Sequence, residues 1–247
     1  MSIPVALQLY TVREEMRRDF VGTLEKVAEI GYAGVEFAGF GGLPASKIKN
    51  LLDRLNLKAV GSHTDVCMLK DKLNEVIEYN LEIGSSYIIC PWAEYFTKQD
   101  YIDAARFYNR IGEKCREKGL NFAYHNHDLE LDFFDGERGL DIIYRETEPE
   151  LVKAEIDTYW VKYAGVDPVG YVRKYTGRCP LVHLKDMEDE KSKNTTEVGE
   201  GILDIGALIK ASEEAGTLWL VVEQDTFKRP ALESAWISFT NLKQLNI

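Results

Sequence analysis

The sequence has few of the features that mark a membrane, secreted or nucleic-acid-binding protein. None of its apolar runs approaches the ~18 residues of a membrane span. The N-terminal stretch has no basic segment leading into an apolar one, so we expect no signal peptide. Basic residues number 30 against 41 acidic ones, for a formal charge of −11. Because nucleic acids and anionic membranes bind basic surfaces, we expect neither as a partner.

Cysteines and glycine-rich motifs are also sparse. The four cysteines (Cys67, Cys90, Cys115 and Cys179) are scattered and include no CxxC pair. Isolated thiols of this kind are typical of reduced, largely buried side chains in a soluble, cytoplasmic protein. The first predicted turn, at 10–14, lacks the GxGxxG pattern that a doubly wound, dinucleotide-binding sheet usually carries, which argues against that fold.

Short apolar runs alternate with amphipathic segments along the chain. The runs have the length of buried strands, and they are Val5–Leu9, Gly34–Phe37, Lys58–Ser62, Tyr87–Cys90, Asn121–Tyr124, Val152–Ile156, Pro180–Leu184 and Trp219–Glu223. Between them, apolar residues recur at helical spacing, most clearly over 20–30, which ends at Gly31. The other predicted helices are Ile48–Leu55, Leu73–Ile83, Tyr101–Cys115, Leu140–Tyr144, Ile205–Ala215 and Ala231–Leu245.

Eight strands in strict alternation with helical connectors predict an α/β fold, a (β/α)8 barrel closed on itself. We expect a single domain over residues 1–247, because no linker or repeat interrupts the pattern. Asp204 is the predicted N-cap of the helix at 205–215, and Pro230 suits the first turn of the last helix. The polar stretch 188–201 is expected as an exposed loop, either a mobile lid over the catalytic face or a plain solvated loop.

Side chains that can bind metal follow three of the last strands. Asp157, His183 and Glu223 each end an apolar run. The carboxyl ends of parallel barrel strands meet at one mouth, and a buried carboxylate or imidazole there is costly unless it is paired. The sequence therefore predicts one divalent cation, Mn, Co, Zn or Mg. The alternatives are an N-cap role for Asp157 and a core hydrogen bond to a backbone carbonyl for His183.

The fifth strand ends in a His-x-His pair. Strand alternation places His125 and His127 on the same inward face, so one can bind metal while the other acts on substrate. Glu130, in the loop that follows, is an alternative carboxylate for the metal shell. The pair can instead be structural, with both imidazoles hydrogen-bonded to loops.

Three further residues are predicted to contact substrate: Glu36, His63 and Lys185, each at or beyond a strand end. The alternative for Lys185 is a salt bridge at the rim with Asp186 or Glu188. Structural hydrogen bonds are the alternative for Glu36 and His63. Four aromatic residues are candidate walls for a sugar ring, or ordinary packing: Trp92, Trp160, Phe37 and Phe40. Lys228 and Arg229 follow the last strand, where many barrels bind phosphate, but a solvated charged turn is the simpler interpretation.

The strings LQLYTVR, GVEFAGF, YHNHDLE, EIDTYWVKYAGVDP, VHLKD, VGEGILD and VVEQD together resemble the xylose-isomerase-like TIM-barrel superfamily. Within it the chain is similar to sugar phosphate isomerase/epimerase proteins. The resemblance implies a TIM barrel with one divalent cation held by Glu, Asp, His and Glu from strands five to eight. Asp157, His183 and Glu223 match the last three positions. His125 stands where the first glutamate is expected, and an HxH at this place resembles the inosose dehydratases.

The resemblance implies a metal-dependent isomerase or epimerase of a small sugar or sugar phosphate. In that chemistry the metal polarises a carbonyl, a base removes the neighbouring proton and an enediolate forms. Glu223 is the predicted base, with His125 or His127 as the acid. The alternative is a lyase or dehydratase of a keto-sugar or keto-cyclitol, which expels a β-hydroxyl or β-glycosyl group.

Two other functions fit the sequence less well. The apurinic endonuclease branch needs a three-metal cluster rich in histidine, whereas the chain has four histidines and carries Trp160 where that branch has a histidine ligand. A non-catalytic sugar-binding barrel would hold no metal. No phosphate cradle is evident in the sequence. Family members are often dimers or tetramers, which leaves a homo-oligomer open.

Overall fold

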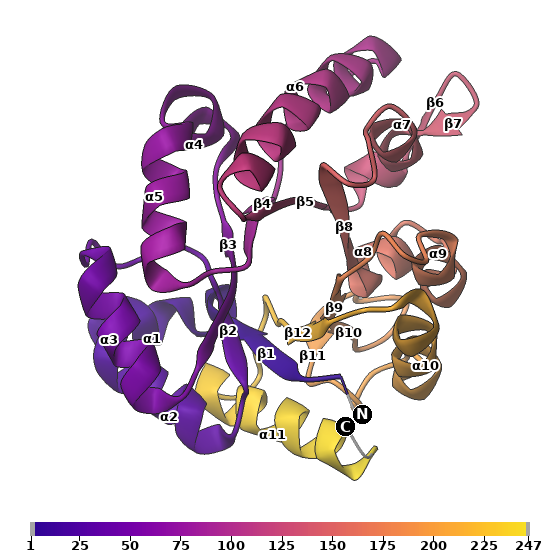
Figure 1. Cartoon of the computed structure of the whole chain (residues 1–247). Helices are drawn as coiled ribbons and strands as arrows, with labels where there is room; N and C mark the ends of the chain where they lie inside the picture. Colours follow the sequence, from indigo (N-terminus) through magenta and orange to yellow (C-terminus); the bar gives the residue numbers. More distant parts are fainter. Residues whose placement is uncertain (1–2, 246–247) are drawn as a thin grey trace.

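The computed structural model describes residues 3–245, and its centre is a closed barrel of parallel strands (Figure 1). The barrel strands are β1 (Val5–Gln8), β2 (Gly34–Phe37), β3 (Lys58–His63), β4 (Tyr87–Cys90), β5 (Asn121–His125), β8 (Val152–Asp157), β9 (Leu181–Leu184) and β12 (Trp219–Val222). The ring closes where β12 pairs with β1. The predicted (β/α)8 TIM barrel is confirmed, and every predicted strand end lies within one residue of the observed one.

Helices surround the barrel. They are α1 (Arg13–Arg18), α2 (Phe20–Ile30), α3 (Ala45–Leu55), α4 (Val66–Asp71), α5 (Leu73–Ile83), α6 (Lys98–Glu117), α7 (Gly139–Arg145), α8 (Thr158–Tyr163), α9 (Pro168–Lys174), α10 (Ile205–Ala215) and α11 (Ala231–Gln244), with short 3-10 turns at Leu9–Val12 and Leu129–Leu131. The expectation of one helix for each connection was too simple. The connections after β1, β3 and β8 each hold two, because helices of six or seven residues are too short to show a clear period.

The predicted helix ends are largely confirmed. Helix α2 ends at Gly31, whose φ of 113° lies in the left-handed region that glycine favours. The Asp204 carboxylate accepts the backbone N–H of Ala207 and so caps α10. Pro230 is the N-cap of α11, one position before the predicted first turn.

The inside of the barrel has an apolar layer toward the amino ends of its strands. This layer, called here the apolar layer, consists of Ala6, Val60, Tyr87, Ile89, Ala123, Leu181 and Val221. Beyond it, toward the carboxyl ends, the inward positions become polar. In β9, for example, buried Leu181 is followed two residues later by buried His183.

A register shift in β3 turns His63 toward the barrel interior. Val35 of β2 pairs with Ala59, whereas the next residue, Glu36, pairs with Gly61, so β3 contains one extra residue at this point. Such a bulge re-aims the side chains that follow it. Gly61 leaves room for the end of the Ile89 side chain here, because an added Cβ would lie 2.4 Å from Ile89 Cδ1.

The loop at 188–201 is largely anchored rather than solvated. Strand β10 (Asp186–Met187) pairs antiparallel with β11 (Thr195–Thr196) inside it. The Asp186 carboxylate accepts backbone N–H groups of Gly199, Gly201 and Leu203 at 2.9–3.1 Å. The tip at 189–194 and residues 199–200 are mainly exposed, whereas 195, 197 and 198 are buried, so the expected exposed loop is confirmed only in part. A second small hairpin joins β6 (Phe133–Phe134) to β7 (Glu137–Arg138).

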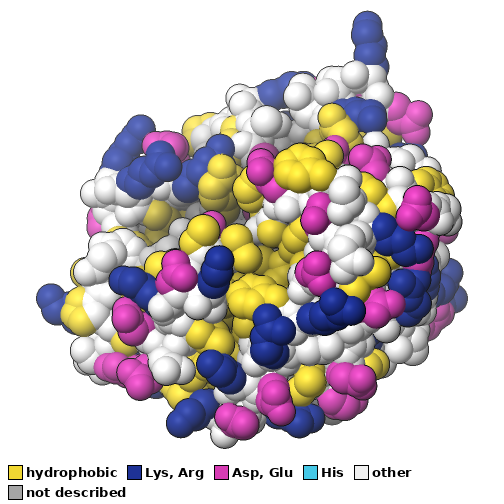
Figure 2. All heavy atoms as spheres, turned by 90° about the horizontal axis from the view of Figure 1, so that it is seen from above, with side chains coloured by type: hydrophobic (Ala, Val, Ile, Leu, Met, Phe, Trp, Pro, Cys, Tyr) yellow, Lys and Arg dark blue, Asp and Glu magenta, His cyan; other side chains and the backbone are white. Residues whose placement is uncertain are grey.

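The surface is mixed in charge. On the face shown in Figure 2, Lys and Arg side chains alternate with Asp and Glu, and hydrophobic side chains gather in a central hollow. The helices between residues 3 and 245 are all too short or too polar to cross a membrane. Cys90, Cys115 and Cys179 are buried as expected, but Cys67 is exposed, because it lies on the outer face of α4.

Candidate metal centre and its cavity

A cavity of about 650 Å³ opens at the carboxyl ends of the strands, where a TIM barrel builds its active site. Its lining consists of Tyr10, Arg13, Ala38, His63, Asp65, Pro91, Trp92, His125, His127, Trp160, Lys185, Glu223 and Asp225. The volume lies within the range of small-molecule sites, ~300–1,000 Å³. Five of the predicted site residues therefore lie on one cavity wall or floor: His63, His125, His127, Lys185 and Glu223.

Four predicted metal ligands come together at the floor of this cavity. Potential ligand atoms of His125, Asp157, His183 and Glu223 all lie within 4.8 Å of one another, and we call these four residues the upper donor set. Asp157 Oδ2 is 3.9 Å from His125 Nε2 and 4.0 Å from His183 Nδ1. Glu223 Oε2 is 3.1 Å from His183 Nδ1. Nitrogen and oxygen donors in this mixture suit Mn, Co or Zn.

The two oxygens of Asp157 have different partners. Oδ1 accepts the backbone N–H groups of Tyr159 and Trp160, so the residue caps α8 as the alternative interpretation predicted. Oδ2 is buried and forms no hydrogen bond within residues 3–245, and the Lys185 ammonium lies 3.2 Å from it. Lys185 also contacts Glu223 and Asp225, so three carboxylates share this one positive charge. The capping role and a cation at Oδ2 are therefore compatible, and the donor set fits a divalent cation.

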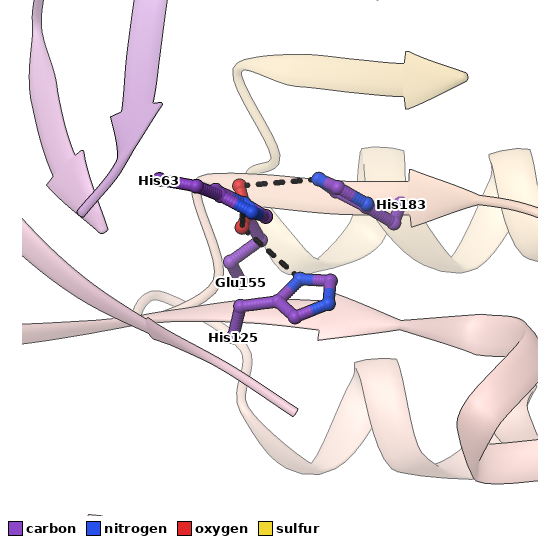
Figure 3. Close-up of side chains that lie close together, drawn as sticks. All are labelled: His63, His125, Glu155 and His183. Atoms are coloured by element: carbon purple, nitrogen blue, oxygen red, sulfur yellow. Dashed lines mark hydrogen bonds and ion pairs between the residues drawn. The ribbon is translucent and has the colours of Figure 1, made fainter. Parts of the chain in front are cut away.

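A second group of potential ligands lies deeper in the barrel. It consists of His63, His125, Glu155 and His183, and we call it the lower donor set (Figure 3). Glu155 Oε2 is 3.0 Å from His63 Nε2 and 3.1 Å from His125 Nδ1. The sequence reasoning missed Glu155, although strand alternation places it on the same inward face as Asp157, two residues later.

Lys185 is buried among three carboxylates. Its Nζ lies 2.8 Å from Glu223 Oε2, 3.2 Å from Asp157 Oδ2 and 3.0 Å from Asp225 Oδ2. Burial alone would lower the pKa of Lys185, but these carboxylates raise it well above its usual value. The alternative salt bridge with Asp186 or Glu188 is wrong. Lys185 is instead an ammonium group that partly neutralises the acidic floor.

His127 and Trp160 lie next to each other in the cavity lining. His127 Nδ1 and Trp160 Nε1 are buried and form no hydrogen bond within the described chain, and their rings lie 5.2 Å apart. Burial, reinforced by the Lys185 charge, lowers the pKa of His127 to about 4. His127 is therefore neutral at pH 7.

Glu130 is turned away from the upper donor set. It accepts hydrogen bonds from Tyr124 Oη at 2.6 Å and from the His127 backbone N–H at 3.0 Å. The suggestion that it completes the metal shell is therefore wrong, since both oxygens are used to hold the loop. Burial raises the pKa of Glu130 to about 7, despite these hydrogen bonds.

Glu36 lies behind the cavity and His63 lies on its wall. Glu36 is fully buried, and its Oε1 accepts from Gln8 Nε2 at 2.7 Å and pairs with His183 Nε2 at 2.8 Å. It therefore does not reach the cavity as a substrate contact. Burial opposes the charge on His63, but Glu36 and Glu155 outweigh it and raise its pKa to about 9.

The aromatic residues divide into two groups. Trp92 and Trp160 line the cavity, and Trp92 is 43% exposed. Phe37 and Phe40 do not line it; their rings pack on each other at 5.2 Å beside β2.

Both basic residues after β12 are already paired. Lys228 contacts Glu188, and Arg229 binds Glu197 and Glu200 at 2.9 and 2.8 Å. These pairs agree with the charged surface turn rather than with a phosphate site.

The fold and the donor sets define a TIM barrel with a candidate metal centre at its catalytic mouth. The chain belongs to the xylose isomerase-like TIM barrel family, whose profile matches residues 24–238. The resemblance seen in the sequence is thereby confirmed.

Known relatives share part or all of the barrel. An inosose dehydratase of Clostridium tetani is 33% identical over 98 residues, 40% of this chain and 32% of that protein. One of Geobacillus thermodenitrificans is 28% identical over 147 residues, 53% of this chain and 49% of that protein. The chain therefore matches between about a third and a half of their length. A sugar phosphate isomerase/epimerase structure from Parabacteroides distasonis shares the fold, with a TM-score of 0.85, 23% identity and coverage of 98% of this chain and 94% of that one.

Proposed function

We propose that the chain is a divalent-metal-dependent isomerase or epimerase that removes a proton next to the carbonyl group of a small carbohydrate. The observation that carries this proposal is the convergence of the upper donor set, whose four potential ligand atoms lie within 4.8 Å of one another. Asp157 Oδ2 forms no hydrogen bond within residues 3–245, and its close contact there is the Lys185 ammonium at 3.2 Å. His125, Asp157, His183 and Glu223 would hold the cation. When bound, the cation would polarise the substrate carbonyl and acidify the neighbouring C–H.

Glu223 is the proposed base. It lines the cavity, and only its Oε2 pairs with His183 and Lys185. Burial alone would raise the pKa of Glu223, but Lys185 and His183 hold it well below its usual value, so the carboxylate is ionised and can accept a proton.

The proton donor requires a change from the sequence-based hypothesis. Burial and neighbouring cations hold the pKa of both His125 and His127 below the usual histidine value, so neither carries a proton to give at the start. Two cations on the cavity wall can give up a proton, Lys185 and His63, and each is held by carboxylates. Arg13, which also lines the cavity, stays protonated in proteins. We assign the proton donor to Lys185 or His63.

A lyase acting on a keto-sugar or keto-cyclitol is the second candidate. It is favoured by His125 at the position where an epimerase would carry a second carboxylate, and by the curated relatives, which are inosose dehydratases. In that reaction the base removes the C–H proton, a C=C bond forms, and the β-hydroxyl leaves as water after protonation. The first half of the reaction is the same in both candidates.

The cavity fits an uncharged carbohydrate better than a sugar phosphate. Trp92 and Trp160 line it and offer flat apolar surfaces for a sugar ring. The basic side chains at the mouth already have partners: Arg13, for example, donates to the backbone carbonyls of Tyr10 and Asp225.

The first test is the metal content of protein purified without chelator or nickel, measured by mass spectrometry. We expect close to one Mn, Co or Zn per wild-type chain and a loss of most of it in Glu223→Ala and His125→Ala. Glu213→Ala, an exposed position on α10, is the matched control and should keep its metal. Keto-sugars would then be screened for solvent-proton exchange, expected of an isomerase, and for water loss, expected of a lyase. Wild-type protein that stays free of metal after soaking in Mn²⁺ would contradict the proposal and favour a sugar-binding barrel.

A further inference from the structure

The two imidazoles of the upper donor set each direct their second ring nitrogen at a fully buried carboxylate. We propose that Glu155 and Glu36 are positioning residues: they fix the tautomer and the ring orientation of His125 and His183, so that an unprotonated nitrogen of each ring faces the cation. This inference rests on the proposed metal centre, and it assigns a role to two carboxylates that the reaction itself does not use.

The hydrogen bond that His125 forms with Glu155 shows which of its ring nitrogens carries the proton. Its Nδ1 lies 3.1 Å from Glu155 Oε2, and a carboxylate at that distance accepts a hydrogen bond, so Nδ1 carries the proton. In a neutral imidazole the other nitrogen then has a free lone pair. That nitrogen, Nε2, is the atom that points toward Asp157 Oδ2, 3.9 Å away in the upper donor set.

His183 follows the same logic with its nitrogens exchanged. Its Nε2 lies 2.8 Å from Glu36 Oε1 and donates to it. The opposite nitrogen, Nδ1, faces the upper donor set, where Glu223 Oε2 accepts a hydrogen bond from it at 3.1 Å. A cation bound to the upper donor set would take the place of that proton. With a cation bound, Glu36 and Glu155 would therefore leave one ring nitrogen of each histidine to face it, and Glu223 would bind the cation instead of the His183 Nδ1 proton. Hydrogen bonds of this kind to metal-binding histidines orient the ring and increase its basicity.

The two carboxylates are themselves held in place. Glu36 Oε1 also accepts from Gln8 Nε2 at 2.7 Å. His63 Nε2 lies between them, 2.9 Å from Glu36 Oε1 and 3.0 Å from Glu155 Oε2. Figure 3 shows His63 beside Glu155. Both glutamates are fully buried, so contact with a substrate in the cavity does not explain them. Their burial is costly without such partners, which suits a fixed support for the histidines.

The competing interpretation is that the lower donor set is itself the cation site. Glu155 Oε1 and Glu36 Oε2 have no hydrogen bond within the described residues, as a ligand oxygen would. That arrangement would require His125 to bind through Nδ1 and His183 through Nε2, which is the opposite tautomer of each ring. The two interpretations therefore differ in one measurable property, the protonated nitrogen of each histidine.

The tautomers can be measured without any substitution. In wild-type protein loaded with Zn²⁺, which is diamagnetic, long-range ¹H–¹⁵N NMR correlations identify the protonated nitrogen of each imidazole. We expect a protonated Nδ1 in His125 and a protonated Nε2 in His183. Protonation at Nε2 of His125 and Nδ1 of His183 would overturn the inference and place the cation in the lower donor set.

A second measurement compares Mn²⁺ affinity in metal-free wild-type protein, Glu155→Gln and Glu36→Gln by isothermal titration calorimetry. The loss of such a supporting carboxylate typically weakens metal binding about 10–100-fold, and we expect that range for both variants. Glu130→Gln is the matched control, because Glu130 is equally buried at the same mouth but binds no imidazole nitrogen. Its Mn²⁺ affinity should stay close to that of wild type.

The outcomes separate this inference from the proposed function. If Glu155→Gln and Glu36→Gln bind Mn²⁺ as Glu130→Gln does, while Glu223→Ala does not bind it, the metal centre stands and the positioning role is overturned. If wild type and Glu223→Ala bind Mn²⁺ equally or not at all, the proposed metal centre fails and this inference fails with it.

Discussion

The two ends of the barrel interior are built on the same strands with opposite chemistry. Toward the amino ends, the apolar layer fills the barrel with side chains such as Ala123 and Val221. Two residues further along the same strands, the inward side chains are His125 and Glu223. The backbone geometry and the inward direction are alike, so only the side chains distinguish the two ends.

This difference shows how one barrel separates stability from function. The apolar layer gains free energy from burial alone and needs no specific partner. The carboxyl end buries several charged groups, each of which loses hydration and depends on a neighbour of opposite charge. Lys185, for example, is held by three carboxylates at 2.8–3.2 Å. The carboxyl end is therefore sensitive to the loss of any one partner and able to respond to a cation.

The largest expected effect comes from placing a charge in the apolar layer. Val221→Asp puts a carboxylate at a fully buried position of β12 that has only apolar neighbours in this layer. We expect a loss of about 5 kcal/mol or more in the free energy of unfolding, or failure to fold, as measured by urea denaturation. Leu218→Asp, at a 55% exposed position on the same segment, is the control and should change stability by less than about 1 kcal/mol. Similar stability of the two variants would contradict the comparison.

A smaller effect is expected from removing the Lys185 ammonium at the carboxyl end of the barrel. Lys185→Met leaves Asp157, Glu223 and Asp225 without their shared partner. We expect metal-free protein to lose about 3–5 kcal/mol in unfolding free energy, because one partner of a buried ionic group is gone. Lys162→Met, which removes a surface pair with Glu190, should cost less than about 1 kcal/mol.

Added Mn²⁺ provides the decisive readout for Lys185→Met. A cation that binds only the folded state stabilises it by mass action, and it would replace part of the missing positive charge. The rise in melting temperature on Mn²⁺ addition should therefore be larger in Lys185→Met than in Lys162→Met. Equal rises would show that Lys185 does not share the carboxylates with the cation.

The smallest expected effect is on the pH dependence of the unfolding free energy, and it comes from Glu130, a buried carboxylate at the carboxyl end of the barrel. The pKa of Glu130 is about 7 in the folded protein against 4.5 as its ordinary value. A raised carboxyl pKa means that the folded state holds the proton more tightly. The contribution of Glu130 to the free energy of unfolding is therefore fully present below pH 4.5. It declines as the pH rises to about 7 and stays constant above that. At about 1.4 kcal/mol for each pKa unit, the decline is about 3 kcal/mol at most.

Glu130→Gln removes this titration while keeping the shape of the side chain. We expect its unfolding free energy to vary less between pH 4.5 and 7 than that of wild type, so that the variant gains on wild type as the pH rises. Urea denaturation at several pH values measures the difference. Parallel pH profiles for the two proteins would be inconsistent with a raised pKa at this position.

Much of the candidate metal centre could be predicted from the polar residues at the ends of the apolar runs. His125, Asp157, His183 and Glu223 follow apolar runs, and the barrel brings their ligand atoms together. Glu155 was missed because, one residue inside a run and charged, it gave no strand-end signal. Glu36 was expected at the cavity, but its side chain is used by Gln8 and His183 behind it. Short helices such as α8 and α9 were also not predicted, because six or seven residues show too little helical periodicity.

The barrel could be predicted from the sequence alone, because eight apolar runs in alternation with helical segments, without a dinucleotide-binding turn, favour a closed parallel sheet. The inward side chains could be predicted too, since strand alternation has a period of two. The carboxylate that each imidazole contacts became known from the folded structure, because His63, Glu36 and Glu155 come from three different strands. Those contacts depend on register shifts and distances of about 3 Å, which no local pattern encodes.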